Sequence, residues 1–227
     1  MKAIILGSTG MIGRSVLLEC IADPDVERIL LINRKAGNVR HDKIEEIIHD
    51  DFFNFSPLME SFVGYDACFF CLGVSSVGMK ESEYRRLTYE LTLNFARTLA
   101  SVNPDLVFCF VSGVGTDETE NGKVMWARIK GAAENAIRRL PFRDAYMIRP
   151  GYIQPLNGVK AKSDLVNLLY IIFKPLYWIL RPFPGLVTNC VALARAMLAV
   201  ARYGYPKKII NVHDINLLAK KFSTTDA

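Results

Sequence analysis

The feature that most constrains the fold is a set of three glycines in ILGSTGMIGRS, near the start of the chain. Gly7, Gly10 and Gly13 follow an apolar run at 2–6, KAIIL, and open a helix-like stretch at 11–22, MIGRSVLLECIA. A buried strand that turns through glycines into a helix is typical of the first unit of a parallel βαβ fold. The spacing therefore predicts a parallel sheet with helices packed on it.

The rest of the first 150 residues repeats this alternation of apolar runs and helix-like patterns. Apolar runs predict strands at 28–33, 66–72, 105–111 and 145–150, a weaker one at 44–51 and a late one at 209–211; helical patterns cover 81–100 and 123–140. Strands separated by helices imply parallel strands that are covered on both faces. We therefore predict an α/β fold of the Rossmann type, with a doubly wound parallel sheet.

The pattern changes after Gly151, where strands become sparse and the chain becomes mostly helical. We predict one domain, 1–227, with a sheet core in 1–150 and a cap or closing segment in 151–227. The most apolar stretch, 165–180, is interrupted by charge and proline after nine positions, too early for the ~20 residues of a membrane span. A packed helix is favoured for it, and a dimer or substrate surface, or peripheral membrane contact through 160–181, stays open.

Composition narrows the class of partner and the compartment. The net charge is +5 and no basic run reaches the length of a nucleic-acid arm, so no nucleic-acid partner is expected. The start of the chain reads as a strand and not as a secretory signal, and the five cysteines are scattered, which indicates a reduced, cytoplasmic protein. Cys68 and Cys71 lie three apart in a strand, on opposite faces, so we expect neither a disulfide nor a metal site.

Each glycine of the loop has a separate task in binding a phosphate group. Gly7 allows the tight turn off the strand, Gly10 allows close approach of a pyrophosphate, and Gly13 lets the helix lie near the sheet. The helix N-terminus adds free N–H groups and a positive dipole end, and hydroxyls in the loop can donate as well. We expect a dinucleotide on Gly7, Ser8, Thr9, Gly10, Met11, Ile12 and Gly13.

The end of the second strand indicates which dinucleotide binds. An NAD site usually has a carboxylate there, but the strand RILLIN is followed by Arg34 and Lys35. A guanidinium pairs with a 2′-phosphate, whereas a carboxylate would repel it. We therefore predict NADP(H), with Arg14 also reaching the phosphate, and with Asp51 and Phe52 beside the adenine.

The chain resembles an atypical short-chain dehydrogenase/reductase. It is similar to the NAD(P)-binding proteins labelled NAD-dependent epimerase/dehydratase and to the NmrA-like cofactor-sensing group. The resemblance covers about residues 1–155 and rests on GSTGMIG, the strand ends CLG and FVSGVG, a W-x-x-x-K helix and the turn MIRPGYIQP. It implies that Leu72 and Gly73 pass near the adenosine. It also implies a nicotinamide contact at the turn formed by Pro150, Gly151, Tyr152 and Ile153.

The resemblance also implies catalytic roles for three residues. Ser112 matches a serine that orients a substrate carbonyl, and Lys130 matches a lysine that holds the nicotinamide ribose. Trp126 stands where the family has the tyrosine that donates a proton, and an indole N–H does not titrate usefully. Tyr152, Tyr89 or Lys130 itself could replace that tyrosine.

The sequence is compatible with two functions. The favoured one is an NADP(H)-dependent oxidoreductase that acts on a small, apolar, carbonyl-like molecule. The alternative, which the replacement of the tyrosine by Trp126 suggests, is a sensor or scaffold that binds NADP(H) without turnover and recognises a regulatory partner protein. The sequence does not decide whether the chain forms an oligomer.

Overall fold

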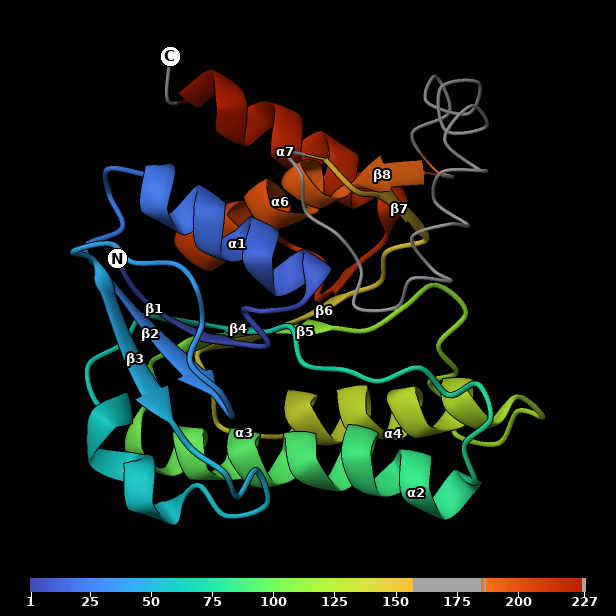
Figure 1. Ribbon diagram of the computed structural model, residues 1–227. Helices are drawn as coiled ribbons and strands as arrows, with labels where there is room; N and C mark the ends of the chain where they lie inside the picture. The colour runs from blue at the N-terminus through green and yellow to red at the C-terminus, as the bar shows by residue number, and fades with distance from the viewer. Residues whose placement is uncertain (157–184, 186, 226–227) are drawn as a thin grey trace.

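A computed structural model describes residues 1–156, 185 and 187–225, and it contains a seven-stranded, fully parallel sheet (Figure 1). The strand order is β3-β2-β1-β4-β5-β6-β9, which confirms the predicted doubly wound fold and the late strand near 209–211. The strands are β1 (Lys2–Leu6), β2 (Arg28–Asn33), β3 (Ile44–Ile48), β4 (Ala67–Phe70), β5 (Val107–Val111), β6 (Asp144–Ile148) and β9 (Ile209–Ile210).

Helices cover both faces of the sheet, as Figure 1 shows. Neighbouring strand residues point to opposite faces, so Ile5 belongs to one apolar core and Ile4 to the other. The first core is closed by α1 (Met11–Ala22), α6 (Cys190–Tyr203) and α7 (Val212–Thr225). The second core lies between the other face of the sheet and the layer of η1 (Ser56–Phe62), α2 (Glu81–Arg85), η2 (Arg86–Glu90), α3 (Leu91–Val102) and α4 (Met125–Arg138).

Three features differ from the sequence-based expectation or lie outside it. The strands β7 (Tyr152–Gln154) and β8 (Val187–Asn189) form a separate parallel pair that the sequence did not predict. The predicted helix at 81–100 is continuous but contains a π-helical segment, η2. The stretches 165–180 and 160–181 lie outside the described residues, and no described helix is long and apolar enough to cross a membrane.

The sheet reverses its winding direction between β1 and β4. The chain builds outward from β1 through β2 to β3, then returns to place β4 on the other side of β1. In such folds the crevice for a ligand lies at the carboxyl ends of the strands, at this point of reversal. Gly7 and Cys71 follow β1 and β4 there. They approach so closely that a Cβ on Gly7 would lie 2.8 Å from the Cys71 carbonyl carbon.

Candidate functional site

The glycine loop forms a tight turn between β1 and α1. Gly7 has φ +80°, a conformation that side chains disfavour, and its carbonyl accepts a hydrogen bond from the N–H of Gly10 at 2.9 Å. A Cβ on Gly13 would lie 2.2 Å from the carbonyl oxygen of Gly7, so α1 can pack here only because residue 13 has no side chain. Gly10 is the N-cap and has no side chain to occupy the first N–H groups of α1. The turn therefore leaves an anion-binding helix end open.

Two cavities meet at this loop and share Gly7 and Leu72. The cavity beside β2 has a volume of about 570 Å³ and the one beside β5 about 510 Å³. The β2 cavity is lined by Gly7, Thr9, Ile32, Asn33, Arg34, Lys35, Ala36, Asp50, Phe52 and Leu72. The β5 cavity is lined by Gly7, Gly10, Met11, Ile12, Cys71, Leu72, Gly73, Val74, Ser75, Val111, Ser112 and Lys130.

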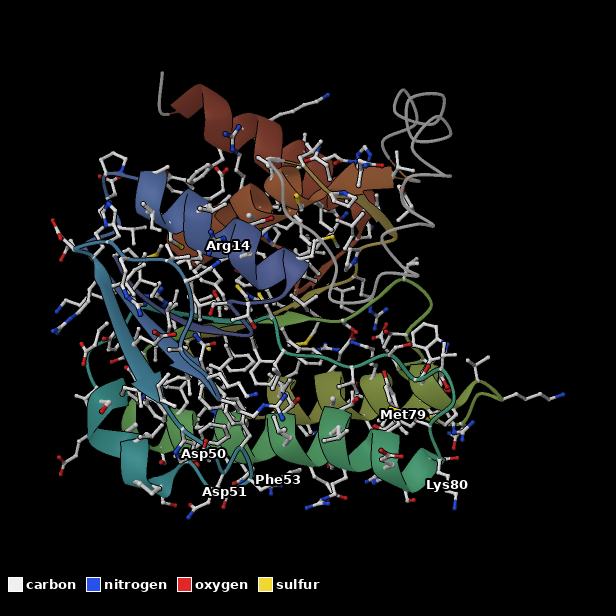
Figure 2. The ribbon with its side chains drawn as sticks, viewed as in Figure 1. Arg14, Asp50, Asp51, Phe53, Met79 and Lys80 are labelled. Carbon is white, nitrogen blue, oxygen red and sulfur yellow. The ribbon has the colours of Figure 1, made fainter. Side chains whose placement is uncertain are left out.

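The β2 cavity contains most of the residues predicted to bind the adenosine half. Arg34 and Lys35 line it, and the Arg34 guanidinium lies 5.9 Å from the centre of the Phe52 ring. Asp51, which was predicted here, is not among the lining residues; Asp50 is. The Asp51 carboxylate accepts a hydrogen bond from the N–H of Phe53, so it closes the turn after β3 (Figure 2).

Two further predicted contacts are directed elsewhere. Arg14 lies on α1, above the sheet in Figure 2, and its guanidinium donates to Oδ1 of Asn38 at 3.2 Å. Ser8 is buried and its hydroxyl donates to Oδ1 of Asn33 at 3.0 Å. Both side chains thus donate to asparagine side chains, and Arg14 supports the loop after β2.

Ser112 lies in the β5 cavity with its hydrogen-bond direction already fixed. Its Oγ is 3.0 Å from Oγ1 of Thr116, and Thr116 donates its own hydroxyl hydrogen to the Gly113 carbonyl at 2.8 Å. The hydrogen between the two hydroxyls must therefore come from Ser112, which leaves Ser112 Oγ as an acceptor. Donation to a substrate carbonyl, the role implied by the resemblance, would require the hydroxyl to turn away from Thr116.

Lys130 reaches the same cavity from α4. Its ammonium group donates to the Val111 carbonyl at 3.3 Å and lies 5.4 Å from the centre of the Phe110 ring. Burial lowers the pKa of Lys130 to about 8, and the negative charge of Glu134 works in the opposite direction. Burial also raises the pKa of the Cys71 thiol, so that thiol stays protonated. Among the titratable side chains that line the described cavity, Lys130 is thus the one that can exchange a proton near neutral pH.

We expect the buried ammonium of Lys130 to make stability depend on pH. Between about pH 8 and 10.5 the unfolded lysine holds its proton more tightly than the folded one, so stability relative to Lys130→Met rises with pH. The gain should reach no more than about 3 kcal/mol. Urea unfolding of both proteins across this range measures it, with the exposed Lys123→Met as control. A difference independent of pH would contradict the expectation.

Trp126 lies outside the β5 cavity. Its indole packs over the loop that follows β5, where a Cβ on Gly115 would be 3.5 Å from the ring, and it is not among the described residues that line either cavity. The hydroxyl of Tyr152 donates to Gln154 at 3.0 Å, and the Tyr89 ring lies under the guanidinium of Arg85. None of these three aromatic residues is among the described residues that line the β5 cavity.

The turn after β6, which was predicted to contact the nicotinamide, is attached to the neighbouring loop. The Pro150 carbonyl accepts a hydrogen bond from the N–H of Val114 at 3.0 Å. Ile153 is buried in the core under α6. The residues Pro150, Gly151, Tyr152 and Ile153 are not among those that line the two described cavities.

A buried ion pair that the sequence reading missed fixes the end of β6 to α4. The Glu134 side chain is fully buried and accepts from Nε of Arg149 at 3.0 Å, while another nitrogen of Arg149 donates to Glu118 at 3.1 Å. Glu134 follows Lys130 by one helical turn. A glutamate on the otherwise apolar face of α4 was the available signal, because a buried carboxylate requires a cationic partner.

The fold, the glycine turn and the crevice at the point of reversal define the class of the protein: it has a Rossmann-type NAD(P)-binding fold. The NAD-bound UDP-glucuronic acid 4-epimerase of Bacillus cereus has the same fold, with a TM-score of 0.65 and 14% identity over 93% of this chain and 77% of that one. No family model matches the chain.

Among curated proteins, the chain is similar to fungal Fmp52 proteins. It is 28% identical to the mitochondrial protein fmp52 of Emericella nidulans over 156 residues, 66% of this chain and 65% of the relative, so the match spans less than two thirds of that protein. It is 22% identical to FMP52-1 of Scheffersomyces stipitis over 97% of this chain and 100% of the relative.

These relatives correct one prediction. Both fungal proteins are named as mitochondrial, which points to mitochondria and away from the cytoplasm. The predicted cytoplasmic location is therefore wrong. The inference failed because it rested on scattered cysteines and the lack of a secretory signal, and a reduced mitochondrial protein shares both features.

Proposed function

We propose that the chain binds NADP(H) and is an oxidoreductase for a small, apolar, carbonyl-like substrate. The observation that carries the proposal is the two-lobed site: two cavities of about 570 and 510 Å³ that join at Gly7, beside an open helix N-terminus. A dinucleotide has this form, because one nucleoside lies on each side of its pyrophosphate. The pyrophosphate belongs on the glycine loop, and a nucleoside belongs in each cavity.

The cations of the β2 cavity support a 2′-phosphate as the preferred group. Arg34 and Lys35 line this cavity, and Asn33 stands at the end of β2, where an NAD site usually has an acid. Asp50 is the acid that lines the same cavity. A guanidinium can bind a phosphate with two hydrogen bonds, which favours Arg34 as the principal contact.

The residues of the β5 cavity suit a reaction at a carbonyl carbon. The reduced cofactor supplies a hydride when bound. Ser112 Oγ accepts a hydrogen bond in its present orientation and can bind a substrate hydroxyl or amide, while Lys130 Nζ can donate a proton to a carbonyl oxygen. The apolar wall formed by Ile12, Val74 and Val111 favours a small apolar substrate.

Titration with NADPH and NADH tests the proposal, followed by fluorescence energy transfer from tryptophan to the nicotinamide. We expect NADPH to bind more tightly than NADH, and Arg34→Ala to weaken NADPH binding about tenfold to a hundredfold, as the loss of one charge-assisted contact predicts. NADH binding should change little. Arg28→Ala, at an exposed ion pair with Glu45, is the matched control. Equal affinity of the wild-type protein for both nucleotides would exclude the proposed preference.

The position of Trp126 favours a second candidate, a sensor that binds the cofactor without turnover. Its indole packs on the loop at Gly113 and Gly115. A movement of that loop on nucleotide binding would therefore displace Trp126 and alter the surface of α4. The two functions differ in one assay. NADPH oxidation with a panel of small ketones and aldehydes supports the oxidoreductase. Tight NADPH binding without oxidation of any of them, together with NADPH-dependent association with a partner protein, supports the sensor.

A further inference from the structure

The loop between β2 and β3 is folded around one carboxylate, that of Glu46 on β3. Its Oε1 accepts from Nδ2 of Asn33 at 2.7 Å and from the N–H of Gly37 at 2.7 Å. Its Oε2 pairs with the guanidinium of Arg40 at 3.4 Å. The approach is close enough that a Cβ on Gly37 would lie 3.1 Å from Oε1. Only 13% of the Glu46 side chain is exposed.

The two hydrogen bonds to Oε1 come from either side of a three-residue segment that contains Arg34 and Lys35. Asn33 precedes this segment and Gly37 follows it, so Glu46 closes it into a small loop. Both cations are exposed, and neither forms an ion pair with a described residue. Glu46 therefore connects the two residues that flank this segment.

The same carboxylate fixes the direction of the bonds that lead to the glycine loop. An ionised carboxylate only accepts hydrogen bonds, so Asn33 must turn its NH₂ group toward Glu46 and its Oδ1 away from it. That Oδ1 is 3.0 Å from the Ser8 hydroxyl, which must then be the donor. Glu46, Asn33 and Ser8 thus form one chain of hydrogen bonds from the β2–β3 loop to the turn after β1.

We infer that Glu46 is a positioning residue that determines the preference for a 2′-phosphorylated nucleotide, an inference that rests on the proposed function. Glu46 holds the segment carrying Arg34 and Lys35 at the rim of the β2 cavity. Its own charge is turned inward, onto Asn33, Gly37 and Arg40. Simple electrostatics gives the opposite expectation, because an acid near a 2′-phosphate should repel it. The two views therefore predict opposite effects of removing the Glu46 carboxylate: weaker NADPH binding if it positions the segment, and tighter NADPH binding if it repels the phosphate.

Titrations of Glu46→Ala and Glu46→Gln with NADPH and NADH decide between them. We expect Glu46→Ala to weaken NADPH binding about tenfold and to change NADH binding by less than about twofold, which lowers the selectivity by nearly the same factor. Glu46→Gln keeps an oxygen for Asn33 and Gly37 and loses the pairing with Arg40, so its effect should be intermediate. If the alanine variant does not fold, the glutamine variant still tests the inference.

Glu45→Gln is the matched control. This neighbouring glutamate lies on the same strand, points to the other side, is 47% exposed and pairs with Arg28 at 3.3 Å. Its replacement should leave both affinities unchanged.

Three outcomes would overturn the inference. Tighter NADPH binding by the Glu46 variants would show that the carboxylate repels the phosphate. An equal loss for NADPH and NADH would show a merely structural role. Unchanged affinities would show no role in binding. If the wild-type protein binds neither nucleotide, the proposed function itself fails, which is a different result from any of these three.

Discussion

Gly13→Ala should abolish binding of NADPH and NADH together. The added Cβ would lie 2.2 Å from the carbonyl oxygen of Gly7 and 2.7 Å from its carbonyl carbon, and both are backbone atoms that a rotamer change cannot move. Helix α1 would have to shift away from the turn, which displaces the N–H groups that face the pyrophosphate. We expect at least about a hundredfold loss of affinity. Fluorescence titration measures the loss, and circular dichroism checks that the protein still folds.

Gly10→Ala provides the comparison for this experiment. A Cβ at residue 10 would meet the same carbonyl oxygen at 3.3 Å, a separation that small movements can relieve. Gly10→Ala should therefore fold with nearly wild-type stability and lose affinity only through crowding of the phosphate. An equal loss of stability in the two variants would mean that the close packing of α1 on Gly7 is not the limiting contact.

Gly131→Ala should strongly destabilise the protein, although helix propensity predicts the opposite. Replacing a glycine inside a helix by alanine normally adds up to about 1 kcal/mol of stability. In α4, however, a Cβ on Gly131 would lie 1.7 Å from the carbonyl oxygen of Asp117 and 2.6 Å from its carbonyl carbon. We expect the clash to dominate and to cost about 3 kcal/mol. Urea unfolding at neutral pH measures the change in the free energy of unfolding.

The same substitution should disturb one cavity and spare the other. The loop that contains Asp117, which the new Cβ would meet, also contains Thr116, whose hydroxyl orients Ser112 in the β5 cavity. Ala136→Gly, at a half-buried position of the same helix, should cost about 1 kcal/mol through propensity alone and serves as control. A stabilised Gly131→Ala protein would show that the loop can leave α4 without cost.

The fold could be predicted because its signals are local. The strand–glycine–helix pattern around Gly7 and the apolar runs of the other long strands sit in short windows of sequence, and all of these strands join the predicted parallel sheet. The pair β7 and β8 could not be predicted, because strands of three residues show no periodicity and gain their hydrogen bonds from partners more than thirty residues away.

The positions of Gly13 in the turn against Gly7 and of Arg34 at the crevice could be predicted from short stretches of sequence, while their binding roles stay predictions. Asp51 was predicted beside the adenine, but Asp50 is the acid that lines the β2 cavity, because the turn after β3 ends the strand alternation that would tell the two apart. The hydroxyl of Ser8 was expected to face a phosphate, and its actual acceptor, Asn33, is distant in sequence. Long-range hydrogen bonds of this kind leave no pattern in the sequence.

The π-helical segment η2 means that α2 and α3 are not one helix in phase. A π turn bonds residue i to i+5 and so contains an extra residue, and each residue of an α-helix corresponds to about 100° of rotation. The residues of α2, which precede η2, are therefore rotated relative to their positions in an uninterrupted α-helix. Among them, Tyr84 is buried, and the Glu81 carboxylate pairs with the Arg128 guanidinium at 2.9 Å. An alignment that treats 81–102 as a single uninterrupted α-helix will therefore be out of step by one position on one side of η2. Comparisons with relatives that lack the extra residue need a gap inside the helix, where gaps are ordinarily forbidden.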